Sequence, residues 1–131
     1  MKDNRVPKYA DDEVYSVLAK ICDNAGLMIE YTDNMSYNGI AENMKILAES
    51  DTNTRKIHMP ISYEYLSYEQ PSILLGHEIA HFLLDEFYNT RYDNELLERE
   101  CDKTGIILFK LAELIALHNE DLKFNELTKQ K

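Results

Sequence analysis

Two histidines and a glutamate stand together in the apolar stretch SILLGHEIAHFLLD, which covers residues 72–85. His77 and His81 are four residues apart, so on an α-helix they lie on the same face, one turn from each other. Two imidazoles in this arrangement can bind one Zn²⁺ ion at about 2.0–2.1 Å per bond. Glu78 is displaced by about 100° around the helix, where its carboxylate can act as a general base on a metal-bound water. The stretch therefore predicts a zinc site with hydrolytic chemistry.

The alternative for these histidines is that they fill core space without a metal. Their neighbours Ile79, Ala80 and Phe82 are uncharged, so two buried, metal-free imidazoles would need partners for all their ring nitrogens in apolar surroundings. Burying such polar atoms without partners costs free energy. This cost favours the metal interpretation.

A catalytic zinc site usually has three protein ligands, so the two histidines leave one ligand to be found. The segment NELLERECDKTGIILF, residues 94–109, offers acidic side chains on the next predicted helix. Glu98 and Asp102 share one face of that helix, which would let Glu98 bind the metal while Asp102 accepts the free N–H of a ligand histidine. Glu100 points about 200° away from Glu98 on an ideal helix and stays the alternative third ligand.

Other residues of this region have a structural and a functional interpretation. Gly105 in a helix interior costs about 1 kcal/mol relative to alanine. It marks either a close approach to the zinc helix or only a weakened helix. Cys101 is expected to be a small buried packing residue and not a ligand. Tyr88 and Tyr92, between the two helices, are candidate hydrogen-bond donors to a transition-state oxyanion.

The hydrophobic pattern predicts the elements that position this site. Helical spacing of apolar residues predicts a helix over residues 9–25, with Gly26 as its stop. Three strands of a small antiparallel or mixed sheet are expected at LMIEY, MKILAES and RKIHMPIS, residues 27–31, 44–50 and 55–62. The tetrad DTNT predicts the turn between the last two strands. Pro71 stands at or near the start of the helix that carries the histidines, which is expected to run to about residue 86.

A second long helix is expected over residues 94–118. Its segment GIILFKLAELIAL, residues 105–117, is apolar on nearly every side, a pattern typical of deep burial. From about residue 119 the chain is polar, which predicts at most a short separate helix and then frayed chain. The expected fold class is α+β: a small N-terminal sheet of about three strands packed with an N-terminal helix, the zinc helix and a long buried C-terminal helix. All of it is expected to form one domain over residues 1–131.

Composition limits the partners of the chain. Its 131 residues include 24 acidic and 14 basic side chains, which gives a formal net charge of −10. Such a surface repels phosphate backbones, so we expect no direct binding to nucleic acid, whereas a basic protein partner is compatible. The sequence shows no secretory signal, no apolar run of membrane-spanning length and no CxxC pair. We therefore expect a cytoplasmic protein that binds no membrane.

These motifs resemble those of the small zinc metallopeptidases typified by ImmA and IrrE. HEIAHFLLD is similar to the first motif of that family, and ERECDKTGIILF is similar to the second. The likeness covers roughly residues 10–117, with Thr104 where phenylalanine is usual and Gly105 where alanine is usual. The resemblance implies a gluzincin-like site for one Zn²⁺ ion. Its ligands would be His77, His81 and Glu98, and Glu78 would be the catalytic base.

The resemblance also implies a function. Stand-alone members of this kind are found with phages and mobile elements and act as antirepressors, so the expected activity is a zinc-dependent endopeptidase of narrow specificity that cleaves a helix-turn-helix repressor. Two alternatives come from other classes of protein. One is a zinc-containing binding protein that regulates its partner by contact without proteolysis. The other is a component of a toxin–antitoxin pair.

Overall fold

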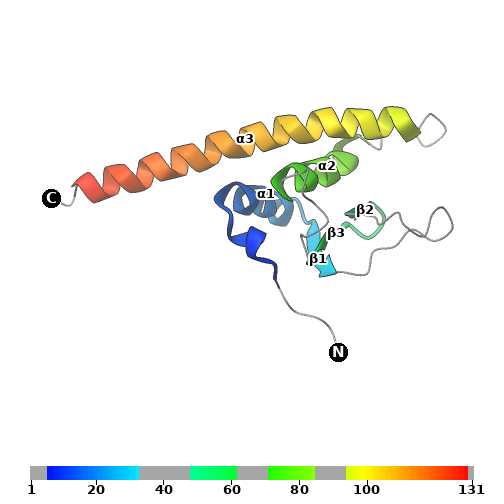
Figure 1. Ribbon diagram of the computed structural model, residues 1–131, viewed down its shortest axis with the longest axis horizontal. Helices are drawn as coiled ribbons and strands as arrows, with labels where there is room; N and C mark the ends of the chain where they lie inside the picture. Colours follow the sequence, from blue (N-terminus) through cyan, green and yellow to red (C-terminus); the bar gives the residue numbers. More distant parts are fainter. Residues whose placement is uncertain (1–5, 33–47, 62–70, 85–93, 130–131) are drawn as a thin grey trace.

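The computed structural model describes residues 6–32, 48–61, 71–84 and 94–129. Within these residues the fold is α+β, as predicted: α-helices combined with a small mixed sheet and a long C-terminal helix (Figure 1). In chain order the elements are η1 (Lys8–Asp11), α1 (Glu13–Asn24), β1 (Met28–Thr32), β2 (Glu49–Asp51), β3 (Lys56–Pro60), α2 (Pro71–Leu84) and α3 (Asn94–Lys129). Helix α3 lies along one side, α1 and α2 form a middle layer, and the sheet lies beyond them.

Local interactions define both ends of α1. Its N-cap Asp12 accepts a hydrogen bond from the backbone N–H of Tyr15 at 3.1 Å, which satisfies a donor that has no partner within the helix. After the helix ends, Gly26 adopts a φ of +74°, a left-handed conformation that costs glycine little. The stop predicted at Gly26 is therefore confirmed. A short 3₁₀ turn, η1, precedes α1.

The sheet is mixed, which was one of the two arrangements predicted. Its strand order is β1-β3-β2, with β1 parallel and β2 antiparallel to the central β3. Ser50 of β2 pairs with Ile57 of β3, so their side chains lie on the same face of the sheet. Because Ile57 is fully buried beneath the helices, Ser50 also faces the helical layer. Strand β2 begins at Glu49, and residues 44–47 of its predicted range lie outside the described residues.

One hydrophobic core joins the sheet to the helices. Its buried members come from every layer and include Tyr15, Leu18, Cys22, Leu27, Ile57, Met59, Leu74, Leu75, Ile79 and Ala112. Helix α2 supplies three of these residues from the same stretch that carries the histidines. The core therefore fixes the rotation of α2 about its axis. None of the helices among the described residues is both long and apolar enough to cross a lipid bilayer.

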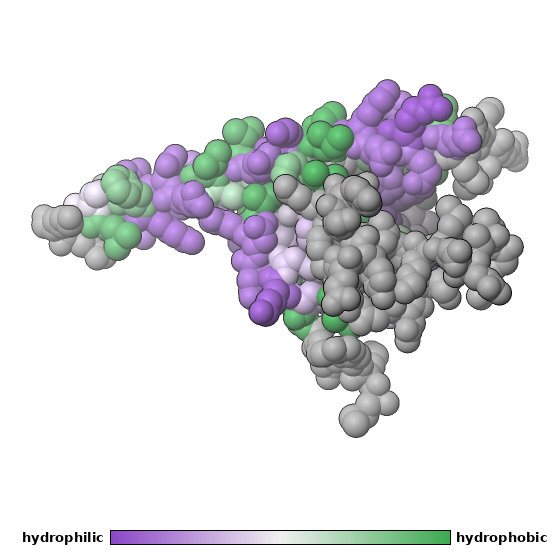
Figure 2. Space-filling model, in the orientation of Figure 1, coloured by the Kyte–Doolittle hydropathy of each residue, from purple (hydrophilic) through white to green (hydrophobic). Residues whose placement is uncertain are grey.

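Helix α3 corrects two predictions. It continues to Lys129 as one helix of 36 residues, so no separate short helix follows residue 118. Its segment 105–117 is not buried on every side either: Ala112 is fully buried, whereas Ile107 is 67% and Leu114 65% exposed. The reason is that α1 and α2 cover only one side of α3. Ala112 and Ala116 are buried at that contact, and green areas along α3 in Figure 2 mark apolar side chains that stay exposed.

The two cysteines are both buried thiols, and neither forms a disulfide. Burial raises the pKa of the Cys22 thiol to about 12, because the thiolate would lose its hydration. In the native protein at pH 8 we expect Cys22 and Cys101 to react with Ellman's reagent at least ~100-fold more slowly than a free thiol, and to react fully in guanidinium chloride. Fast reaction of the native protein would contradict this burial.

The same thiol makes stability depend on pH. An exposed thiol in the unfolded chain titrates near 9.0, below the value of the buried Cys22. The unfolded chain therefore releases this proton first, and the folded state should lose stability as the pH rises above about 9.

Candidate metal centre

Helix α2 places both histidines where they face α3. Leu75 and Ile79 bury the opposite side of α2 in the core, and the helical period then directs His77 and His81 to the boundary between α2 and α3. The imidazole rings lie with their centroids 5.1 Å apart. Both side chains are 16% exposed, so the ring nitrogens are sheltered but reachable from solvent.

His77, Glu78 and His81 form a group that could hold a metal ion. One donor atom from each residue lies within 4.8 Å of the donor atoms of the other two. Two of the donors are imidazole nitrogens and the third is a carboxylate oxygen, all of which bind divalent transition metals such as zinc. The predicted metal-binding pair and its neighbouring glutamate are therefore close enough in space to share one ion.

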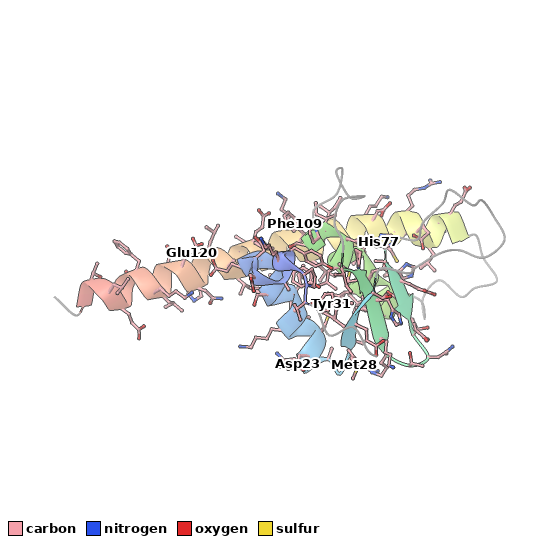
Figure 3. All side chains as sticks on the ribbon, turned by 60° about the horizontal axis from the view of Figure 1, so that its bottom comes forward. Asp23, Met28, Tyr31, His77, Phe109 and Glu120 are labelled. Atoms are coloured by element: carbon pink, nitrogen blue, oxygen red, sulfur yellow. The ribbon has the colours of Figure 1, made fainter. Side chains whose placement is uncertain are left out.

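Helix α3 brings two more of the predicted residues to the histidines. The Glu98 carboxylate lies 3.0 Å from His77 Nε2 through one oxygen and 3.1 Å from His81 Nε2 through the other. On the other side of the His77 ring, Asp102 Oδ1 lies 2.7 Å from Nδ1. Figure 3 shows His77 where α2 meets the first half of α3. The carboxylate of Glu98 thus faces the same nitrogens that a metal would bind.

Two glycines allow α2 and α3 to approach this closely. A Cβ atom built on Gly76 would lie 2.6 Å from the carbonyl oxygen of Gly105, and one built on Gly105 would lie 2.6 Å from the backbone nitrogen of His77. Real Cβ atoms do not come so near to backbone atoms. Of the two interpretations of Gly105, the structure supports the close approach of the helices. Glu98 and Asp102 lie on the same helix within two turns of this contact.

Glu78 is buried in the interior, where its side chain contacts the sheet. Glu78 is 4% exposed. The hydroxyl of Ser50 in β2 lies 3.0 Å from Glu78 Oε1 and 2.8 Å from the backbone oxygen of Glu78. Burial raises the pKa of the Glu78 carboxyl above its ordinary value. The nearby imidazoles of His77 and His81 and the hydroxyl of Ser50 act in the opposite direction. Glu78 is thus a buried carboxyl group with a defined orientation, placed beside two imidazoles.

Ser50 was not identified from the sequence. A single serine in a strand has no chemical signature, and only the pairing of β2 with β3 places its hydroxyl under α2. A helpful signal would have been its position in the strand: Ser50 is a small polar residue that falls on the buried face of the sheet by alternation.

The remaining candidates take other positions. Glu100 does not contact the histidines in the described structure and instead lies 3.5 Å from Lys103, so Glu98 is the glutamate that α3 presents to them. Cys101 is fully buried, which fits a packing role. Tyr88 and Tyr92 lie outside the described residues.

The chemistry of these donors fits a metal ion. Each Nε2 atom faces a carboxylate oxygen of Glu98, and the Nδ1 atom of His77 faces Asp102. A ligand histidine commonly donates its other ring N–H to a carboxylate, which fixes the tautomer that leaves Nε2 for the metal.

Comparison of the chain with protein-family models, with curated proteins and with solved structures finds no match.

Proposed function

We propose that this protein is a zinc-dependent peptidase of narrow specificity. The observation that carries the proposal is the meeting of His77 Nε2, His81 Nε2 and the Glu98 carboxylate, with the buried carboxyl of Glu78 next to them. Two histidines and a glutamate are one of the ligand sets of catalytic zinc sites, which keep a further position open for water or substrate.

The two glutamates near the histidines would have different roles. Glu98 would be the third ligand, because its oxygens lie at both Nε2 atoms. Glu78 would be the base, because Ser50 and its burial hold its carboxyl on the side of the sheet. When bound, zinc supplies a Lewis acid and lowers the pKa of its water.

The residues of the chain would then carry the proton transfers. Asp102 accepts the Nδ1–H of His77 and so keeps that ring oriented. Glu78 takes the proton of the attacking water and later delivers it to the leaving amine. The raised pKa of Glu78 suits this exchange, because the carboxyl then holds the proton more readily than an exposed glutamate does.

The proposed substrate is an extended segment of a protein. Strand β2 forms one edge of the described sheet, and its residue Ser50 touches Glu78. A peptide added as a further strand along this edge would therefore pass close to the base. The net charge of −10 favours a partner with a basic surface. A DNA-binding repressor, the substrate that the family resemblance suggests, has such a surface, and an antirepressor role would follow.

Metal analysis of the purified protein and two variants tests the zinc centre. We expect about one zinc ion per chain in the wild type and at least roughly 100-fold weaker zinc binding in Glu98→Ala, since a lost ligand costs more than a lost supporting residue. The matched control is Glu100→Ala, two positions away on the same helix, which should keep its zinc. Plasma mass spectrometry after dialysis measures all three proteins. Wild-type protein without metal, even after zinc is supplied at neutral pH, would refute the proposal.

A further inference from the structure

The Glu78 carboxylate lies close to two partners, the candidate metal site and the hydroxyl of Ser50. One of its oxygens lies within 4.8 Å of a ring nitrogen of His77 and of His81, so all three side chains could bind the same metal ion. The same carboxylate accepts a hydrogen bond from Ser50 Oγ, which lies 3.0 Å from Oε1. Carboxylates bind zinc well, at about 2.0–2.2 Å. A buried carboxylate this close to a zinc centre therefore needs a restraint if it is to stay a base.

We propose that Ser50 is the positioning residue that keeps Glu78 from binding the metal. This inference rests on the proposed zinc centre and adds to it a residue from the sheet. With the restraint in place, the open coordination position stays available to water and substrate. Without it, Glu78 would turn toward the metal and occupy that position. The centre would then have the closed set of four protein ligands that is typical of structural zinc sites.

Ser50 is well suited to hold this position. Its hydroxyl lies within hydrogen-bonding distance of two acceptors on α2, the Glu78 carboxylate at 3.0 Å and the Glu78 backbone oxygen at 2.8 Å. The hydroxyl therefore stays against the helix whichever of the two accepts its hydrogen bond. The backbone of Ser50 is fixed by pairing with Ile57, whose side chain is fully buried. Glu78 is itself 4% exposed, so solvent has little access to replace the lost donor. Removing the hydroxyl should leave the metal as the strongest partner for the carboxylate.

The test uses Co²⁺ as a spectroscopic replacement for zinc in the full chain. Ser50→Thr and Ser50→Val form a matched pair, because the two side chains have nearly the same shape and only threonine has the hydroxyl. Circular dichroism first establishes that both variants fold. The visible absorption of the Co²⁺ forms then reports the ligands, and titration with azide reports whether the open position is accessible.

We expect Ser50→Thr to resemble the wild type. Ser50→Val should show a changed Co²⁺ spectrum and an azide dissociation constant raised about tenfold or more, the size of one hydrogen bond to a charged group. Adding Glu78→Gln to Ser50→Val should restore azide binding, since a neutral amide is a poor ligand.

The possible failures are distinguishable. Equal spectra and equal azide affinities for the valine and threonine variants would overturn the role of Ser50 and leave the metal centre intact. Failure of the wild-type protein to bind Co²⁺ would instead overturn the proposed centre, and this inference with it.

Discussion

Glu78→Gln is expected to abolish peptide hydrolysis and to leave the zinc content unchanged. The amide has nearly the shape of the carboxyl and can still accept the hydrogen bond of Ser50, but it cannot take a proton from water. Loss of general acid–base catalysis costs about 10²–10⁴-fold in rate. Incubation with a peptide library and with basic DNA-binding proteins, followed by mass spectrometry of the fragments, measures the rate. Metal analysis of the same sample gives the zinc content.

Glu100→Gln is the matched control for this change. It makes the same chemical substitution on α3 at a residue that lies against Lys103, and it should leave the rate unaltered. Cleavage by Glu78→Gln at the wild-type rate would exclude Glu78 as the base. Loss of zinc together with activity would make Glu78 a ligand. An equal effect of wild type and variant on a partner, without cleavage, would favour a binding protein that acts by contact.

Gly105→Ala should have the largest effect on the structure of the site. The added methyl would lie 2.6 Å from the backbone nitrogen of His77, and a backbone atom cannot move aside as a flexible side chain does. The helices must separate, which carries Glu98 and Asp102 away from His77. We expect a loss of about 1–3 kcal/mol in the free energy of unfolding from overpacking. Zinc affinity should fall roughly tenfold or more, because ligand and supporting carboxylate both shift.

The direction in which Gly105→Ala changes the free energy of unfolding identifies the cause. In an uncrowded helix, replacing glycine by alanine stabilises by about 1 kcal/mol, so a destabilised variant identifies the helix contact as the cause. Ile106→Ala, at the next position, where the side chain is half exposed, places an alanine in the same turn and should keep its zinc affinity. Thermal unfolding and a zinc titration compare the two variants. A Gly105→Ala protein more stable than wild type, with equal zinc affinity, would contradict the close packing.

Local patterns were sufficient to predict much of this fold. The helical spacing around the histidines and Pro71 at the helix start define α2, and Gly26 defines the end of α1. These features depend on neighbours within a few residues, so the sequence contains the needed information. Which glutamate of α3 faces the histidines depends instead on how α2 and α3 pack. The sequence favoured Glu98 with Glu100 as the alternative, and in the structure the crossing at Gly105 presents Glu98 to the imidazoles.

The burial of α3 shows where sequence patterns fail. A helical segment with apolar residues on every side predicts a helix surrounded by protein. Burial depends, however, on which sides of the helix other elements cover. Here α1 and α2 pack against the small residues of the helix, such as Ala112 and Ala116, and leave Ile107 and Leu114 exposed. Ser50 is a similar case, because its position under α2 results from strand pairing between distant parts of the chain. Neither outcome follows from the composition of a single segment.

The candidate site is divided between the helix pair α2–α3 and the sheet, and this division determines what substitutions in each part can affect. The atoms that would hold the metal all belong to α2 and α3, whose relative position is set by a pair of facing glycines. The sheet touches the site through β2, at the carboxyl that would handle protons. Substitutions in the strands can therefore change how the Glu78 carboxyl is held without removing His77, His81 or Glu98, whereas substitutions at the helix crossing change the distances among those three side chains. The contact that orients the proposed base and the contact that brings the proposed ligands together thus lie in different parts of the fold.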